Sequence, residues 1–278
     1  MLGYSKQAYY QYHQRNERQG QNKQLALRQV LSVRQRMPRL GTRKLYHLLA
    51  DDFKAMRLGI GRDKLFTLLR HEGLLIHKQR KYVKTTMSRH WMRKHPNLVK
   101  AKALTHPEQV WVADITYIAT KEGHQYLHLI TDAYSKQIMG YELCNNLNAG
   151  SSIKALRMAL AKRQYAQNPL IHHSDRGLQY CSAAYTNILI ANNISISMTE
   201  QSDPYENAIA ERVNGILKDE FGLNEVFDDS KQLYKQAAQA INIYNNERPH
   251  LSIRLNTPAM MHKYPVGKLK SWKKERQL

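Results

Sequence analysis

The stretch that decides the fold is "QVWVADITYIAT" (residues 109–120), an apolar run with a single acid, Asp114, near its middle. Such a run of β-branched and aromatic residues predicts a strand. A carboxylate inside an apolar strand costs several kcal/mol unless it is paired or bound to a cation. We therefore expect a buried strand that presents Asp114 to a charged or polar partner.

The residues that follow predict a mixed α/β fold. "QYLHLITDAYSKQIMGYELC" (125–144) continues the first strand into two more, with breaks at "KEGH" and "YSKQ", so the three form an antiparallel meander. The order β-β-β-α-β-α-β-α is that of an RNase H-like fold, a mixed five-stranded sheet flanked by helices. The remaining elements expected are a helix over 149–166, a strand over 170–174, a helix over 183–193, a strand over 194–198 and a helix over 206–221.

Charge divides the chain into three parts. Residues 1–104 hold 24 Lys and Arg against 5 Asp and Glu, residues 105–250 hold 12 against 16, and residues 251–278 hold 7 against 1. Basic flanks favour a polyanionic partner, because each Lys or Arg on a phosphate releases condensed counterions. A ribosomal-type protein or plain solubilising charge is the alternative, although neither explains the acidic middle.

The basic front part predicts an all-helical region. A helix over 21–37 with Leu25, Leu27, Val30, Leu31 and Val33 should stop at Pro38. Two short amphipathic helices follow, about ten residues apart, and resemble a helix-turn-helix, although a small basic bundle fits equally well. We expect Thr42 to cap the first of them, with Leu45, Leu48 and Leu49 inward, and the second to bury Leu65, Leu68 and Leu69 and end at Gly73. The expected phosphate contacts are Arg43, Lys44, Arg62 and Lys64.

These patterns divide the chain into five segments. We expect a basic helical segment (1–38), a helix-turn-helix-like DNA-binding region (39–85), a basic linker (86–104), an α/β catalytic core (105–250) and a basic tail (251–278).

Two further acids accompany Asp114. Asp175 ends the strand in "LIHHSDRGLQYC" (170–181); alone, it would be a turn cap, with Gly177 in an unusual backbone angle. Glu211 lies on a polar helix face with Asn207, Asn214 and Lys218. Three such carboxylates at one point suit Mg²⁺ or Mn²⁺. Two ions about 3.5–4 Å apart can activate an attacking oxygen and stabilise the leaving one in phosphodiester cleavage.

Together, "WVADITYI", "HHSDRGLQY", "DPYENAIAERVNGILKDE", "YNNERPHLSI" and "TPAM" resemble the OrfB-type transposases of the IS-three family of bacterial insertion sequences. The resemblance implies a retroviral-integrase-like DDE core in which Asp114, Asp175 and Glu211 are the triad, with 35 residues between the last two. It implies a DNA transposase that performs metal-dependent 3′-end cleavage and strand transfer. Its implied partners are insertion-sequence ends, target DNA, further copies of the chain and the product of an upstream reading frame.

The resemblance has one departure. The family often carries "SGKGNPYDNA" before the catalytic helix, whereas this chain has "TEQSDPYENA" (199–208), so the resemblance does not extend to the flexibility and DNA contacts of that loop.

Other polar residues around the triad receive lesser roles. Asp132 is expected beside the triad or in a structural role, and His173 beside the triad, where it contacts DNA or influences Asp175. His172 and His173 otherwise either bind metal or are simply packed. Tyr244, Asn245, Arg248 and His250 either contact DNA or pack a C-terminal helix. The expected DNA contacts of this part of the chain are Arg176, Asn207, Asn214, Lys218 and Arg248.

Composition removes several classes of protein. Cys144 and Cys181 are too few for a disulfide scaffold or a cysteine-rich zinc site. No apolar run of about 18 residues and no signal-peptide pattern occur, so we expect a cytoplasmic, nucleoid-associated protein and no membrane partner. Two rival functions stay open, another RNase H-like nuclease and a catalytically silent DNA-binding relic or regulator.

Overall fold

The computed structural model describes residues 6–77, 94–100, 102–200 and 207–267. The chain forms two compact units, Met1–Gln79 and Arg80–Leu278. Residues 1–5, 78–93, 101, 201–206 and 268–278 lie outside the described residues, and with them part of the expected linker, the expected loop over 201–206 and the end of the expected tail. No described helix is both long enough and apolar enough to cross a membrane.

The first unit is all-helical, as its sequence predicts. It consists of α1 (Lys6–Arg36), α2 (Thr42–Ala55) and α3 (Arg62–His71). The prediction that Leu65, Leu68 and Leu69 face inward is confirmed, and Gly73 follows α3 with φ +65°. A connection over 56–61 joins α2 to α3, shorter than expected but longer than the three or four residues of a standard helix-turn-helix.

Two details of this unit were predicted wrongly. Helix α1 begins at Lys6 rather than at residue 21, and it buries Ala26, Val30 and Val33 while Leu25 and Leu31 stay exposed. Thr42 does not cap α2, because the cap residue is Gly41 and Thr42 is the first helical residue.

The second unit contains a five-stranded sheet in the order β3-β2-β1-β4-β5. Strands β1 (Val110–Thr120), β2 (Gly123–Asp132) and β3 (Ile138–Cys144) form the predicted antiparallel meander. Strands β4 (Leu170–Ser174) and β5 (Ile194–Met198) run parallel to β1, as expected from their alternation with helices. The predicted RNase H-like, mixed α/β architecture is confirmed.

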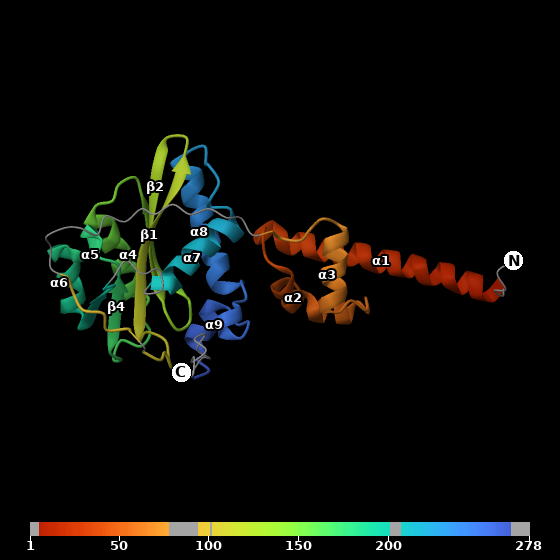
Figure 1. The fold of residues 1–278 in the computed structure, drawn as a ribbon, viewed down its shortest axis with the longest axis horizontal. Coiled ribbons are helices and arrows are strands. Elements are labelled where there is room, and N and C mark those ends of the chain that lie inside the picture. Colours follow the sequence, from red (N-terminus) through yellow and green to blue (C-terminus); the bar gives the residue numbers. More distant parts are fainter. Residues whose placement is uncertain (1–5, 78–93, 101, 201–206, 268–278) are drawn as a thin grey trace, which may run out of the picture. The chain divides into compact units, whose positions relative to one another are not determined.

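Helices cover both faces of this sheet (Figure 1). On one face lie α4 (Ala149–Ala161), α5 (Leu178–Cys181) and α6 (Ala183–Ala191), packed on a core that includes Trp111, Met139 and Tyr185. On the other lie α7 (Ala208–Phe221) and α8 (Ser230–Asn246). Helix α4 approaches β3 so closely at Gly140 that a Cβ there would lie 2.0 Å from the Ala155 carbonyl oxygen.

The start of the expected basic tail contributes to the core instead. A 3₁₀ turn (η2, Leu251–Ile253) and helix α9 (Pro258–Lys263) follow α8. Ile253 and Met261 are fully buried with Tyr134 in one apolar cluster. Apolar burial therefore outweighs the basic composition of this segment at least as far as α9.

Candidate active site

Asp114 lies in β1, the central strand of the sheet, between β2 and β4. On the β4 side the parallel register pairs Val112 with His173. Extending this register by two residues places Asp114 level with Asp175, immediately after β4. The sheet thus brings together two acids that are about 60 residues apart in the sequence.

The pKa of Asp114 responds to the charges of two other acids, Asp175 and Glu211. Burial first, and then the charges of Asp175 and Glu211, raise the pKa of Asp114 to about 7. Hydrogen bonds from Asn214 and from the Ile115 backbone oppose this rise. Because nearby like charges disfavour ionisation, a cation at this point would relieve a repulsion that the fold itself creates.

Helix α7 brings its predicted polar face to β1. The amide of Asn214 donates to Asp114 Oδ2 at 2.7 Å, and the amide of Asn207 donates to the Ala113 carbonyl at 3.1 Å. Lys218 Nζ lies 4.5 Å from the centre of the Tyr117 ring. Burial lowers the pKa of Lys218, and the nearby charge of Asp114 only partly offsets this. Glu211, in the first turn of the same helix, is exposed to solvent.

Asp175 also caps the turn after β4. Its Oδ1 accepts a hydrogen bond from the Gly177 N–H at 3.0 Å, so the turn-cap interpretation is confirmed, and the catalytic role stays a prediction. The expected unusual backbone angle is wrong, because Gly177 has φ −65°. Glycine is needed for space instead: a Cβ there would lie 3.0 Å from Asp175 Oδ1 and 2.9 Å from Gln179 Oε1.

The donor set fits a hard divalent cation by type. Mg²⁺ is commonly held by one or two carboxylates together with water and substrate phosphates. Within the part of the chain that the structure describes, no three acids, histidines or cysteines lie close enough together to hold one ion at once. Asp114 and Asp175 are therefore the pair that would hold it, with Glu211 available from α7.

Comparisons with known proteins agree with this geometry. Two family models described as "Integrase core domain" match residues 105–204 and 192–258. An insertion element IS600 protein of 31 kDa from Shigella sonnei is 35% identical over 93% of this chain and 95% of its own length. The transposase of insertion sequence IS629 from the same organism is 30% identical over 75% of this chain and 68% of its own length. The chain belongs to the insertion-sequence transposases with an integrase core.

Further relatives include the transposase InsF of insertion sequence IS3A from Escherichia coli K12, 32% identical over 61% of this chain and 59% of its own length. Among solved structures, the HTLV-2 integrase catalytic core in complex with magnesium is 19% identical, with a TM-score of 0.45, over 56% of this chain and 97% of that one.

The two adjacent histidines of β4, His172 and His173, are buried. His172 Nε2 lies 2.9 Å from the Tyr185 hydroxyl. Burial, and to a lesser extent repulsion from His173, lower the pKa of His172 to about 3. His173 is fully buried and lies 2.8 Å from Ser197 Oγ. Burial thus excludes the direct DNA contact suggested for His173.

Of the two roles expected for Asp132, beside the triad or structural, its hydrogen bonds show the structural one. Its carboxylate accepts hydrogen bonds from the Glu108 N–H at 2.6 Å and from the Ser135 N–H and hydroxyl at 2.7 Å. It pairs with Trp111 in the sheet, three register positions from Asp114. Its two oxygens are occupied in holding the start of β1 and the turn after β2.

Arg248 was also placed wrongly as a DNA contact. It forms a two-point ion pair with Glu220 at 2.7 and 2.8 Å, and only 2% of its surface is exposed. The Tyr244 hydroxyl donates to the Lys136 carbonyl, and the Asn245 amide bonds both backbone groups of Ile138. The packed-helix alternative therefore describes this segment.

The remaining predicted DNA contacts differ in exposure. Lys44 is buried, which removes most of its side chain from contact with a phosphate. Arg43 is exposed, Arg62 is exposed and pairs with Asp63 at 2.9 Å, and Lys64 donates to the Gly59 carbonyl. Arg176 is half-buried beside Asp175. Apart from Lys44, these residues stay predictions.

Sequence reasoning missed Glu108, a buried acid just before β1 that is at the centre of a second group of charged residues. Its buried carboxylate accepts from the backbone of Gln164 at 2.7 Å and Tyr165 at 3.0 Å and contacts Arg163 and His262. Burial would raise the pKa of Glu108, but these hydrogen bonds outweigh it and lower the pKa. Its partners come from distant parts of the chain, so no local pattern marks it.

Proposed function

We propose that this transposase cleaves DNA at the 3′ ends of its insertion sequence and transfers those ends to target DNA, with Asp114, Asp175 and Glu211 as its catalytic carboxylates. The observation that carries the proposal is the pKa of Asp114, raised to about 7 by burial and by the charges of the other two acids. An integrase core with an unrelieved cluster of negative charge is suited to a divalent cation. The names of the relatives, which include transposases, support the same class of reaction.

The chemistry consists of two phosphodiester exchanges. Water attacks the phosphorus at the element end, and the bond to the flanking nucleotide breaks to leave a free 3′-hydroxyl. That hydroxyl then attacks a phosphodiester of the target and displaces a new 3′-hydroxyl. The exchanges need no covalent bond to the protein, whose part is positioning and charge neutralisation.

Each residue of the site has a distinct part. Asp114 and Asp175, fixed by the sheet, would hold Mg²⁺ or Mn²⁺, with Glu211 joining from α7 and a second ion accommodated with the DNA. When bound, such a cation would supply charge stabilisation for the attacking water and for the leaving oxygen. Asn214 orients the Asp114 carboxylate through its hydrogen bond. Lys218, whose ammonium lies over the Tyr117 ring, is the proposed contact for a DNA phosphate.

DNA binding is assigned to the basic front part of the chain. Residues 1–104 carry 24 Lys and Arg against 5 Asp and Glu, and Arg43, Arg62 and Lys64 are its proposed phosphate contacts. Asn207 is a weaker candidate, because it is buried and bonded to β1. Self-association on DNA and a fusion or complex with the upstream-frame product complete the proposed partners.

The test is strand transfer on oligonucleotides that carry the element ends, with Mg²⁺ present. We expect wild-type chain to cleave and join them, and Glu211→Gln to lose both reactions while it still binds the duplex. Glu225→Gln, an exposed position after α7, is the matched control and should keep full activity.

Three results would redirect the proposal. Activity unchanged by Glu211→Gln would contradict the assignment of the triad. Cleavage of RNA–DNA hybrids without strand transfer would favour another RNase H-like nuclease. DNA binding without any cleavage by the wild-type chain would favour a silent binding protein.

A further inference from the structure

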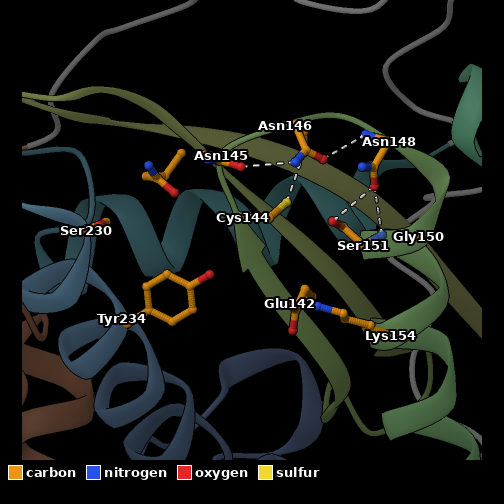
Figure 2. Close-up of a pocket in the computed structure, with 11 residues that line it drawn as sticks. Glu142, Cys144, Asn145, Asn146, Asn148, Gly150, Ser151, Lys154, Ser230 and Tyr234 are labelled. Atoms are coloured by element: carbon orange, nitrogen blue, oxygen red, sulfur yellow. Dashed lines mark hydrogen bonds and ion pairs between the residues drawn. The ribbon is translucent and has the colours of Figure 1, made fainter.

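A polar cavity of about 510 Å³ lies at the end of β3, outside the carboxylate cluster. It is bounded by the loop over 145–148 and by the first turns of α4 and α8 (Figure 2). Figure 2 shows Tyr234 of α8 across the cavity from this loop and from the start of α4. The volume falls within the roughly 300–1,000 Å³ range of small-ligand sites.

One buried amide in this cavity lacks a partner. Gln125, on β2, lines the cavity and is only 7% exposed. Its side chain hydrogen-bonds to none of the residues that the structure describes. A side-chain amide without a partner at the wall of a cavity favours a ligand that carries both donors and acceptors.

The rest of the lining adds complementary groups. Asn146 donates to Asn145 at 3.0 Å, and Asn148 caps α4 by accepting from the Ser151 N–H at 3.3 Å. The thirteen-residue helix α4 therefore points its amino end at the cavity, where backbone N–H groups favour a phosphate. Lys154 pairs with Glu142 at 3.1 Å at the same wall.

The cavity is connected to the catalytic edge of the sheet. Gln179, four residues after Asp175, donates from its side-chain amide to the Leu147 carbonyl at 3.0 Å. Cys144, the last residue of β3, pairs with Tyr126, which pairs with Tyr117 of β1. Cys144 at the cavity is therefore level with Tyr117, three residues after Asp114 in β1. The cavity and the segment after Asp175 lie at the same end of the sheet, where β1, β3 and β4 have their carboxyl ends.

We propose that this cavity takes one unpaired nucleotide from the single-stranded end of the DNA. Side-chain amides match the donor and acceptor pattern of a base edge. The Tyr234 ring, half-exposed, gives the base a surface on which to stack, and the amino end of α4 takes its phosphate. A base in a duplex has its edge occupied by its complement, so only an unpaired one fits. This inference rests on the proposed DNA function.

The experiment measures the affinity of the full chain for three duplexes with the element-end sequence. One has a short single-stranded extension, one has the same extension without bases, and one is blunt. We expect the extension with bases to bind about tenfold more tightly than the abasic one. Tyr234→Leu and Asn146→Ala should each reduce this ratio to below about threefold, and Tyr264→Leu, an exposed tyrosine of the α9 region, should leave it unchanged.

The outcomes separate this inference from the function on which it rests. Asn146→Ala changes an exposed loop residue, so its effect does not depend on whether Tyr234→Leu folds. Equal binding of all three duplexes, or an unchanged ratio in both cavity variants, overturns the nucleotide site and leaves the proposed function standing. Binding of none of the duplexes overturns both.

Discussion

Two acids of this region, Glu108 just before β1 and Asp114 within it, have pKa values shifted in opposite directions. Glu108 is fully buried and accepts hydrogen bonds from two backbone amides and from Arg163 and His262, and its pKa is lowered. Asp114 accepts a side-chain hydrogen bond from Asn214 and faces two further carboxylates, and its pKa is raised to about 7. The protein satisfies the first charge by itself and leaves the second unsatisfied. A buried carboxylate whose negative charge is not balanced by the protein indicates a site for a cation. A carboxylate balanced by hydrogen bonds and ion pairs indicates a structural role.

The largest expected effect comes from removing the satisfied acid. Glu108→Ala leaves the buried Arg163 and His262 without their carboxylate partner. We expect a loss of about 3–5 kcal/mol in the free energy of unfolding, measured by urea denaturation. Asp114→Asn, which removes repulsion instead, should cost no stability. An equal loss in the free energy of unfolding for Glu108→Ala and Asp114→Asn would contradict the different roles proposed for the two acids.

A smaller effect is expected at the contact that steadies Asp114. Asn214→Ala removes the 2.7 Å hydrogen bond to its carboxylate, which should lower metal affinity and strand transfer by roughly 10–100-fold. The pKa of Asp114 should rise further, so the activity profile should shift to higher pH. Asn242→Ala on exposed α8 surface is the control. A uniform fall in activity with no shift along the pH axis would assign Asn214 to packing alone.

The smallest effect is the pH dependence of stability without metal. The pKa of Asp114 is about 7 in the folded chain and roughly 3.9 when unfolded, so the folded chain binds the extra proton between these values. Stability from this residue should therefore fall as pH rises from about 4 to about 7 and then level off. Glu108, whose pKa is lowered, should act oppositely and lose its contribution as pH falls below about 4.

Thermal melting between pH 4 and pH 8 in EDTA checks this contrast. Asp114→Asn should flatten the decline above pH 4, and added Mg²⁺ should stabilise the wild-type chain more at pH 8 than at pH 5, because the cation competes with the proton. A wild-type curve that rises over this range would contradict the raised pKa of Asp114.

Local patterns were enough to predict the elements around the site. β-Branched and aromatic residues predicted β1, and the spacing of Asn207, Asn214 and Lys218 predicted one polar face on α7. Two of these residues bond directly to β1, and the third lies over Tyr117. Arg248 shows the limit of such reasoning, because a basic residue in a polar segment looks the same whether it meets a phosphate or Glu220.

The sequence by itself determined the strands, the helices, the charge division and the three acids, because these depend on periodicity and composition over short stretches. The tertiary structure alone decided which acids are satisfied. Glu108 gains its partners from residues 163–165 and from His262, and Asp114 gains its repulsion from Asp175 and Glu211. Such long-range neighbours are set by sheet order and by helix packing, and they determine whether a buried charge is stabilised by the protein or left for a ligand.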